Sequence, residues 1–300
     1  MARRHAQPGL VACAGLWAAC VLSAQPRPIA RLDSGAVNES SGVVASRQNT
    51  GIYWTHNDSG DGPNIFAFNL KGHVVGRWTV TGARNVDWED IAIGPGPVPG
   101  RWYLYIGDIG SNDRDRRQVT VYRVEEPKLR GVECRSGCKT APASALRLRY
   151  PDRAHNAETL MMHPKSGDLY IVSKASGVDL DTIVFVARAG ELSAASVVTL
   201  KEVATLDIPE PIFKRLAGGI TGGDISPDGT RVVLCDYLRK YEAVLPAGSK
   251  FDAIWERPFT AVTMGLAMQV EGICYSADGK SIIATSEGSP CPVLQMEVQK

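Results

Sequence analysis

Acidic side chains recur at the start of short apolar runs along this sequence of 300 residues. Five copies of this polar-then-apolar pattern begin at Glu39, Asp87, Asn156, Thr221 and Gln269, roughly 50 to 70 residues apart. Carboxylates that converge from such repeats either share a cation or raise one another's pKa. Oxygen ligands from Asp and Glu suit calcium or magnesium better than zinc. The repeats therefore predict a divalent-cation site if the fold brings them together.

We expect calcium as the ion, and the predicted metal ligands are Asp87, Glu89, Glu158, Asp224 and Glu271. The predicted catalytic residues lie in or near the same repeats and are His56, Asp58, His155 and Lys174. In this hypothesis the cation lowers the pKa of a bound water, a histidine moves protons, and the lysine stabilises a developing anion. The structural alternative for each acid is a bond to backbone amides that ties neighbouring repeats together.

The elements that would position these residues are β-strands. Each apolar run leads into a turn or loop and then a second strand, and turns such as Pro227-Asp228-Gly229 are typical of hairpins. Few stretches carry a helical period, so the fold class is all-β. The first repeat gives four strands, at 42–47, 52–55, 65–69 and 74–81. We predict a β-propeller of five blades with four antiparallel strands each, and six blades is the alternative count.

In a propeller the first strand of each blade lines the central axis, and its start lies on the same face as the end of the second strand. The repeated acids should therefore converge on one face. The fifth repeat has only three strands, at 272–276, 281–285 and 293–298, and we expect Pro28 to Leu32 to supply the fourth. Such a strand closes the ring and hides its open edges. In the fourth repeat the outer strand is expected at 254–261. The segment 210–216, which follows the last strand of the third repeat, is either a short helix or a loop.

The overall charge argues against a nucleic-acid partner, because the net charge is only +1 and no basic run is interleaved with aromatics. The amino-terminal segment has the layout of a signal peptide. It contains Arg3 and Arg4, then an apolar run from 9 to 22, and then small residues at 23 and 24. We expect a signal over 1–24 and one domain over 25–300, secreted or periplasmic, monomeric and without a transmembrane segment. A lipid anchor at Cys13 or Cys20 is the alternative to simple cleavage.

Cysteine spacing fits an exported protein. Removal of the signal leaves five cysteines, of which Cys134 and Cys138 lie close enough in sequence for a local disulfide. The odd number leaves at least one thiol free. Zinc at this pair is the alternative, although no second Cys or His pair stands nearby to complete four ligands.

Several motifs resemble known proteins. Glu39-Ser40-Ser41-Gly42, the stretch Trp54 to Gly60, Asp87 to Ala92, Glu271-Gly272-Ile273 and Ser286-Glu287-Gly288 are similar to exported bacterial β-propellers of the esterase-like phytase and SdiA-regulated families. The resemblance implies a propeller with an axial, calcium-dependent site and a hydrolase role on phosphate or other esters.

Two functions follow from these observations. The first is a divalent-cation-assisted hydrolase of phosphate or carboxylate esters, with a small-molecule ester or phosphate as its ligand. The alternative is a non-catalytic propeller of the cell envelope that binds a ligand or partner on the same face. Free carboxylates at the axis favour the first, and acids that are all bonded to backbone amides favour the second.

Overall fold

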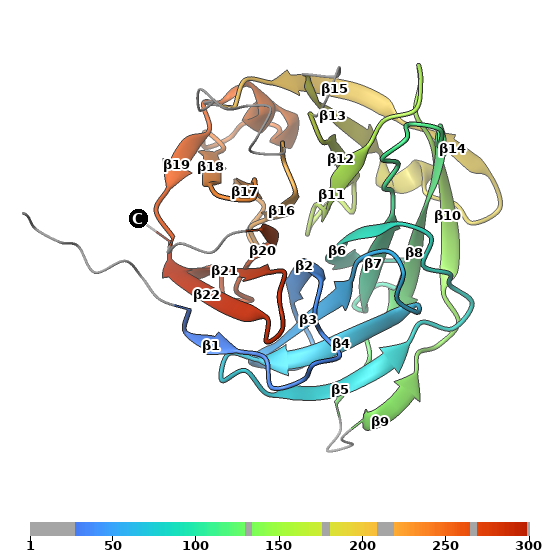
Figure 1. Ribbon diagram of the computed structural model, residues 1–300. Coiled ribbons are helices and arrows are strands. Elements are labelled where there is room, and N and C mark those ends of the chain that lie inside the picture. The colour runs from blue at the N-terminus through green and yellow to red at the C-terminus, as the bar shows by residue number, and fades with distance from the viewer. Residues whose placement is uncertain (1–27, 130–133, 176–180, 209–218, 265–268, 299–300) are drawn as a thin grey trace, which may run out of the picture.

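Five sheets stand around a central axis in the computed structural model (Figure 1), which describes residues 28–129, 134–175, 181–208, 219–264 and 269–298. The predicted five-bladed β-propeller is confirmed, and the count of six blades is wrong. The expected signal peptide over 1–24 and the segment 210–216 lie outside the described residues.

The blades follow one another along the chain, and their strands are numbered in chain order. Blade 1 consists of β2 (Ser40–Ala45), β3 (Ile52–Asn57), β4 (Asn64–Asn69) and β5 (Val74–Thr79). Blade 2 consists of β6 (Trp88–Pro95), β7 (Trp102–Asp108), β8 (Gln118–Glu125) and β10 (Ser144–Arg149). Blade 3 consists of β11 (Ala157–Met162), β12 (Leu169–Ser173), β13 (Thr182–Ala187) and β15 (Lys201–Leu206). Blade 4 consists of β16 (Gly222–Ile225), β17 (Arg231–Cys235), β18 (Lys240–Val244) and β19 (Thr260–Val262). Blade 5 consists of β20 (Val270–Tyr275), β21 (Ser281–Ser286), β22 (Pro292–Glu297) and β1 (Ala30–Arg31).

The ring closes as the sequence predicts, because β1 pairs antiparallel with β22 in the last blade. The amide of Ile29 donates to the carbonyl of Val293 at 2.8 Å, and that of Leu32 donates to Cys291 at 2.9 Å. Leu32 is buried in the core beside this pairing. The first and last parts of the described chain therefore complete one blade together.

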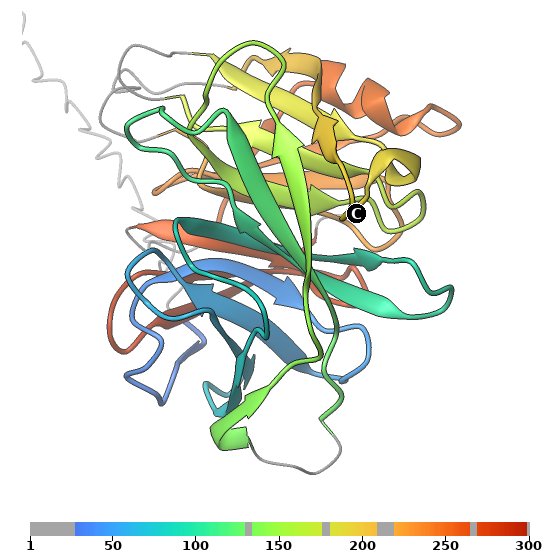
Figure 2. The same ribbon diagram turned by 90° about the vertical axis from the view of Figure 1, so that its right-hand side faces the viewer.

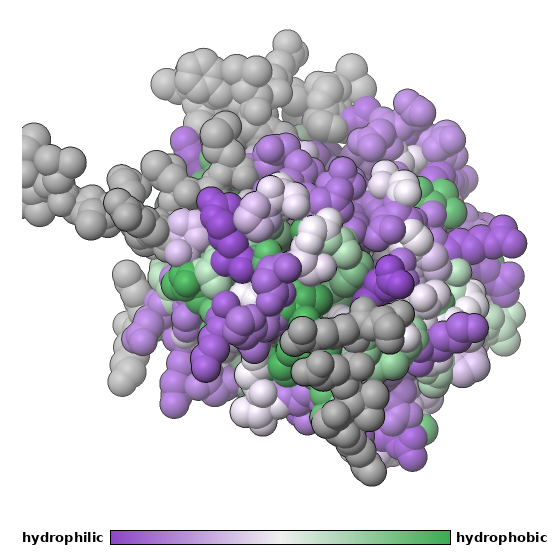
Figure 3. All heavy atoms as spheres, turned by 60° about the horizontal axis from the view of Figure 1, so that its bottom comes forward, coloured by the Kyte–Doolittle hydropathy of each residue, from purple (hydrophilic) through white to green (hydrophobic). Residues whose placement is uncertain are grey.

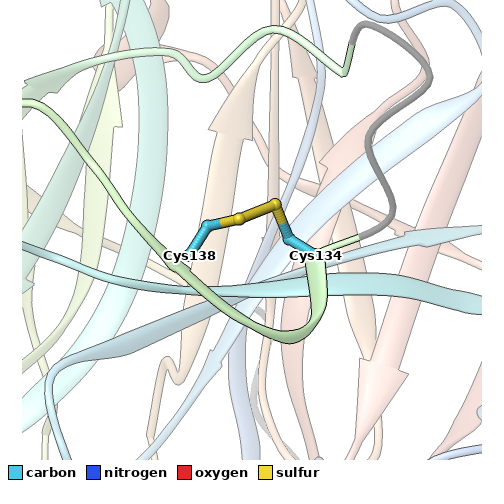
Figure 4. Close-up of a disulfide and its surroundings, with 2 residues drawn as sticks. All are labelled: Cys134 and Cys138. Carbon is cyan, nitrogen blue, oxygen red and sulfur yellow. A yellow bond between two sulfur atoms is a disulfide. The ribbon is translucent and has the colours of Figure 1, made fainter.

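Two short strands that the sequence analysis missed extend blades 1 and 2 at their outer edges. Strand β9 (Cys134–Lys139) runs parallel to β5, and β14 (Val197–Thr199) runs parallel to β10. The predicted disulfide between Cys134 and Cys138 is confirmed within β9 (Figure 4), which lies at the rim of the molecule (Figure 2). The other cysteines of the described residues, at 235, 274 and 291, are free and buried.

The outer part of blade 4 differs from the expected strand at 254–261. A 3-10 helix, η2 (Phe251–Glu256), occupies the first half, and the outer strand β19 is confined to Thr260–Val262. Ile254 and Trp255 are adjacent and both buried, whereas adjacent side chains of a strand point to opposite faces. The helical turn lets both pack into the core, where the Trp255 ring lies 5.4 Å from that of Tyr170 in blade 3.

The inner strands β2, β6, β11, β16 and β20 surround the axis (Figure 1) and contact one another. Small residues allow this close approach. A Cβ atom on Gly42 would lie 2.6 Å from Oδ1 of Asp90 and 2.7 Å from the backbone nitrogen of Ile91. No real Cβ tolerates such contacts, so β2 and β6 can lie this close only with glycine there. On the other side of β2, Ser40 Oγ is 2.8 Å from Thr285 Oγ1 of blade 5.

The surface in Figure 3 is mainly hydrophilic, with hydrophobic residues visible between the polar ones. Large exposed apolar side chains among the described residues are scattered, at Ile29, Val86, Val98, Val197, Leu238 and Val244. The described part of the chain contains no helix long and apolar enough to cross a membrane.

Candidate functional site at the axial mouth

One end of the axis collects the starts of the inner strands and the ends of the second strands, and we call it the axial mouth. The antiparallel registers place these residues opposite one another in every blade. The pairs are Ser40 with Asn57, Trp88 with Asp108, Ala157 with Ser173, Gly222 with Cys235, and Val270 with Ser286. Because the inner strands of neighbouring blades also contact one another, the pairs of different blades meet at the mouth.

A β-bulge interrupts the register immediately after this first pair in blades 1, 2, 3 and 5. The residue left without a partner is Ser41, Glu89, Glu158 or Glu271, respectively. Bulges re-aim a side chain and are common next to active sites. Blade 4 has no such interruption between Gly222 and Ile225. Three glutamates thus occupy one equivalent position in three blades, and each is about 95% buried, with exposed fractions of 5 to 6%.

Asp58, Asp87 and Glu89 come together at the mouth. One carboxylate oxygen from each lies within 4.8 Å of the others, which is close enough for all three to bind one metal ion. Asp58 follows β3 in blade 1, Asp87 precedes β6, and Glu89 is the bulge residue of β6. Among the described residues, this is the one group of three or more acidic, His or Cys side chains with such spacing.

The loop after β7 supports this cluster through Gly110 and Arg116, neither of which was among the predicted site residues. A Cβ atom on Gly110 would lie 2.1 Å from Oε1 of Glu89 and 2.4 Å from Oδ2 of Asp87, so a larger residue there would displace both carboxylates from this arrangement. Arg116 holds the loop by donating to the Gly110 carbonyl at 2.8 Å and to Oδ1 of Asp108 at 2.7 Å. The feature of the sequence that could have indicated this loop is Asp108-Ile109-Gly110, at the end of the second strand of blade 2.

Electrostatic repulsion accompanies the burial of these acids. Burial, followed by the charges of Glu158 and Asp58, raises the pKa of Glu89 well above its ordinary value. Burial and Asp58 also raise the pKa of Asp87. Carboxylates held this way bind either a proton or a cation more readily than they stay charged and unpaired.

Lys174 lies on the blade 3 side of the mouth and is paired. Its Nζ is 2.6 Å from Oε1 of Glu158 and 2.9 Å from the Tyr237 hydroxyl, and it lies over the Tyr237 ring at 4.7 Å from the centroid. Burial opposes its charge, but Glu158 and the tyrosine more than offset this and raise the pKa of Lys174, so it stays protonated. Burial raises the pKa of Glu158 to about 7 even with this partner.

Asp224 occupies a different kind of position. Its two carboxylate oxygens accept the amides of Ile225 at 2.8 Å and of Tyr275 in blade 5 at 2.9 Å. Asp90 makes the equivalent bonds from blade 2, to Ile91 at 2.8 Å and to Leu160 in blade 3 at 2.9 Å. Both aspartates tie neighbouring blades together, which is the structural alternative for the repeated acids. We therefore leave Asp224 outside the candidate site.

The two predicted catalytic histidines lie in aromatic surroundings. His56 is fully buried, its Nδ1 donates to the Asn57 carbonyl at 2.8 Å, and its ring meets that of Trp88 edge-on. Burial lowers the pKa of His56, so its ring is neutral. His155 bonds Asp152 through Nε2 at 2.9 Å and packs against aromatic rings of blades 2 and 3. Their roles as proton carriers stay predictions.

Comparison with known proteins adds no family. No protein-family model matches the chain, and no curated protein matches it.

Proposed function

We propose that this propeller binds a divalent cation, calcium by preference, at Asp58, Asp87 and Glu89, and uses it to hydrolyse phosphate or carboxylate esters. One observation carries the proposal, namely the convergence of these three carboxylates within 4.8 Å. In the part of the chain that the structure describes, neither the Asp87 nor the Glu89 carboxylate has a hydrogen-bond donor to it, so both are free to bind an ion. Calcium binds roughly six to eight oxygen ligands, so three carboxylates leave coordination positions for water and substrate.

The proposed chemistry uses the three acids on the side of blades 1 and 2 and Lys174 on the side of blade 3. A bound cation polarises an ester oxygen and lowers the pKa of a water molecule on the same ion. On the other side, Lys174 stays protonated next to Glu158 and the Tyr237 hydroxyl, and it supplies positive charge near the acids. We assign it to the anion that develops during hydrolysis. Asp87 and Glu89 position the ion from blade 2, and Asp58 does so from blade 1.

A non-catalytic binding propeller is the second candidate, and a specific observation favours it. Glu158 neutralises Lys174, and both histidine rings are buried, so the acids are the groups left to act on a substrate. In that case calcium would hold a ligand or partner at the mouth without turnover.

Export supports either function, because extracellular calcium is plentiful. The disulfide between Cys134 and Cys138 fits an oxidising compartment. We therefore keep the secreted or periplasmic location, with cleavage near Ala24, as part of the proposal.

An activity screen separates the two candidates. The protein lacking residues 1–24 is assayed on para-nitrophenyl phosphate and para-nitrophenyl acetate, in calcium and in chelator. Hydrolysis is expected in calcium and should fall to background in chelator and in Asp58→Asn. Asp278→Asn, in an exposed turn at the other end of the strands, is the matched control and should keep full activity. Calcium binding without turnover of either ester would favour the binding propeller.

A further inference from the structure

A groove on blade 1 lies outside the candidate site. It consists of two adjoining hollows of about 320 Å³ each, and both are lined by Ala36, Phe66 and Arg77. The segment 33–39, which connects β1 to β2, contributes to both hollows, as do β4 and β5. Asp58, Asp87 and Glu89 line neither of them. Small-ligand pockets typically measure about 300–1,000 Å³, so the groove is large enough for a small molecule.

One wall of the groove, the segment 33–39, is fastened near both of its ends. Near its start, the Asp33 carboxylate accepts the amide of Val74 on β5 at 2.9 Å. Near its end, Nδ2 of Asn57 on β3 donates to the Ala36 carbonyl at 2.8 Å. The wall is therefore held in place before a ligand arrives, and a preorganised site loses less entropy on binding.

Arg77 contributes to both hollows and has no committed partner. It lies opposite Phe66 in the register of β4 and β5, so the two side chains share one face of the blade. Its side chain extends along Gly137 in the disulfide loop, where a Cβ atom would lie 3.3 Å from Nη2. None of its five N–H donors has an acceptor within the described ranges. A planar guanidinium of this kind matches the geometry of a carboxylate.

The second hollow also contains two acids, Glu39 and Asp61. Asp61 is half-buried and is oriented by Nδ2 of Asn57 at 2.9 Å and by the Gly62 amide at 2.7 Å. Glu39 is exposed, and its carboxylate is bonded to no residue of the described chain. One hollow thus offers a cation and two anions to the same ligand.

The first hollow is different in character. Four of its lining residues, Ala36, Phe66, Val74 and Gly76, have no polar group in their side chains. Phe66 is buried in the core of blade 1, so its ring is fixed. This hollow therefore suits an apolar group, next to the charged groups of the second.

We propose that the groove binds a free α-amino acid with an apolar side chain. Its carboxylate pairs with Arg77, its ammonium group with Glu39 and Asp61, and its side chain enters the hollow beside Phe66 and Val74. Neither the cation nor the hydrolase activity proposed above is needed for this binding.

The mixture of charges in the groove decides the ligand class. A ligand with only negative charge would be repelled by the two acids, and one with only positive charge would be repelled by Arg77. A zwitterion pairs with both, and the charge-assisted hydrogen bonds that result are the stronger kind.

The test is a calorimetric titration of the protein lacking residues 1–24 with leucine, valine and phenylalanine, in chelator at neutral pH. We expect saturable binding of one amino acid per chain, weakened about 10-fold or more by Arg77→Ala and by Glu39→Gln. Both residues are exposed, so these variants should fold. Lys71→Ala is the matched control, because Lys71 is an exposed basic residue of the same blade outside the groove, and it should bind as the parent does.

Analogues of leucine separate the two charged contacts. Leucinamide lacks the carboxylate and N-acetylleucine lacks the ammonium group, so each should bind about 10-fold or more weakly than leucine. Arg77→Ala should cause no further loss with leucinamide, and Glu39→Gln should cause none with N-acetylleucine.

Three results would overturn the proposal. They are no saturable binding of any of the three amino acids, an affinity for leucine that Arg77→Ala leaves unchanged, and analogues that bind as tightly as leucine. Because the titration is made in chelator, any of these results would leave the proposed cation site standing. A protein that binds leucine but neither calcium nor esters would support the groove and contradict the proposed function alone.

Discussion

Replacement of Asp87 by asparagine is expected to weaken calcium binding by on the order of 30-fold, which is about 2 kcal/mol of lost attraction between the ion and one carboxylate. The same change should raise the melting temperature in chelator, because Asp58, Asp87 and Glu89 then no longer repel one another as three charges. Opposite effects on ion affinity and on stability without the ion are the signature of a binding site. Calorimetric titration and thermal unfolding in chelator measure the two quantities.

The pH dependence in chelator should have a defined sign. The folded pKa of Glu271 lies at about 9, above its ordinary value of 4.5, so the folded state holds a proton that the unfolded state has released between these values. Stability then falls as pH rises from 4.5 to 9. Glu89 acts in the same direction, because burial also raises its pKa.

The outcome that would contradict the predicted role of Asp87 concerns calcium affinity. An Asp87→Asn variant that bound calcium as tightly as the parent would show that Asp87 is not a ligand of the ion.

Replacement of Asp90 by alanine is expected to destabilise the fold by about 2–6 kcal/mol, because it leaves the buried amides of Ile91 and Leu160 without an acceptor at about 1–3 kcal/mol each. Asp90 also packs over Gly42 of blade 1, so its loss leaves a cavity at the point where three blades meet. Denaturant unfolding of the protein in chelator measures this loss.

The control is Asp87→Ala, only three residues away in the same motif, which should not destabilise the protein in chelator. Asp224→Ala should behave like Asp90→Ala, because it removes the acceptor for Ile225 and Tyr275. If Asp87→Ala were as destabilising as Asp90→Ala, the division of these acids into structural and ion-binding groups would be wrong.

The blade count and the ring closure could be predicted from the sequence because both depend on repetition. Each blade restarts with the same polar-then-apolar pattern, and the fifth blade lacks a strand that only a segment near the amino terminus can provide. The parallel strand β9 could not be predicted, because it depends on packing against Trp78 at an edge rather than on a local pattern. The 3-10 helix η2 was missed because Ile254 and Trp255 resemble a short β-strand in composition.

The candidate site was predictable only as a group. Asp87-Trp88-Glu89-Asp90 contains three acids, and their roles differ because of the register between β6 and β7. The bulge turns Glu89 toward the proposed ion site, whereas Asp90 accepts a hydrogen bond from the amide of Leu160 in the next blade. Nothing in the one-dimensional sequence marks a bulge. In blade 4 the register is regular, so Asp224 takes the place of Asp90 and not that of Glu89. Sequence reasoning treated both as equivalent acids and could not separate them.

The most direct test of the cation site is a calorimetric titration of the protein lacking residues 1–24 with calcium after treatment with chelator. We predict one calcium ion per chain bound at the mouth, with an affinity that Asp58→Asn and Glu89→Gln each reduce and that Asp278→Asn leaves unchanged. A titration that gives no saturable binding, or binding that the mouth variants do not alter, would contradict the presence of a cation site at Asp58, Asp87 and Glu89.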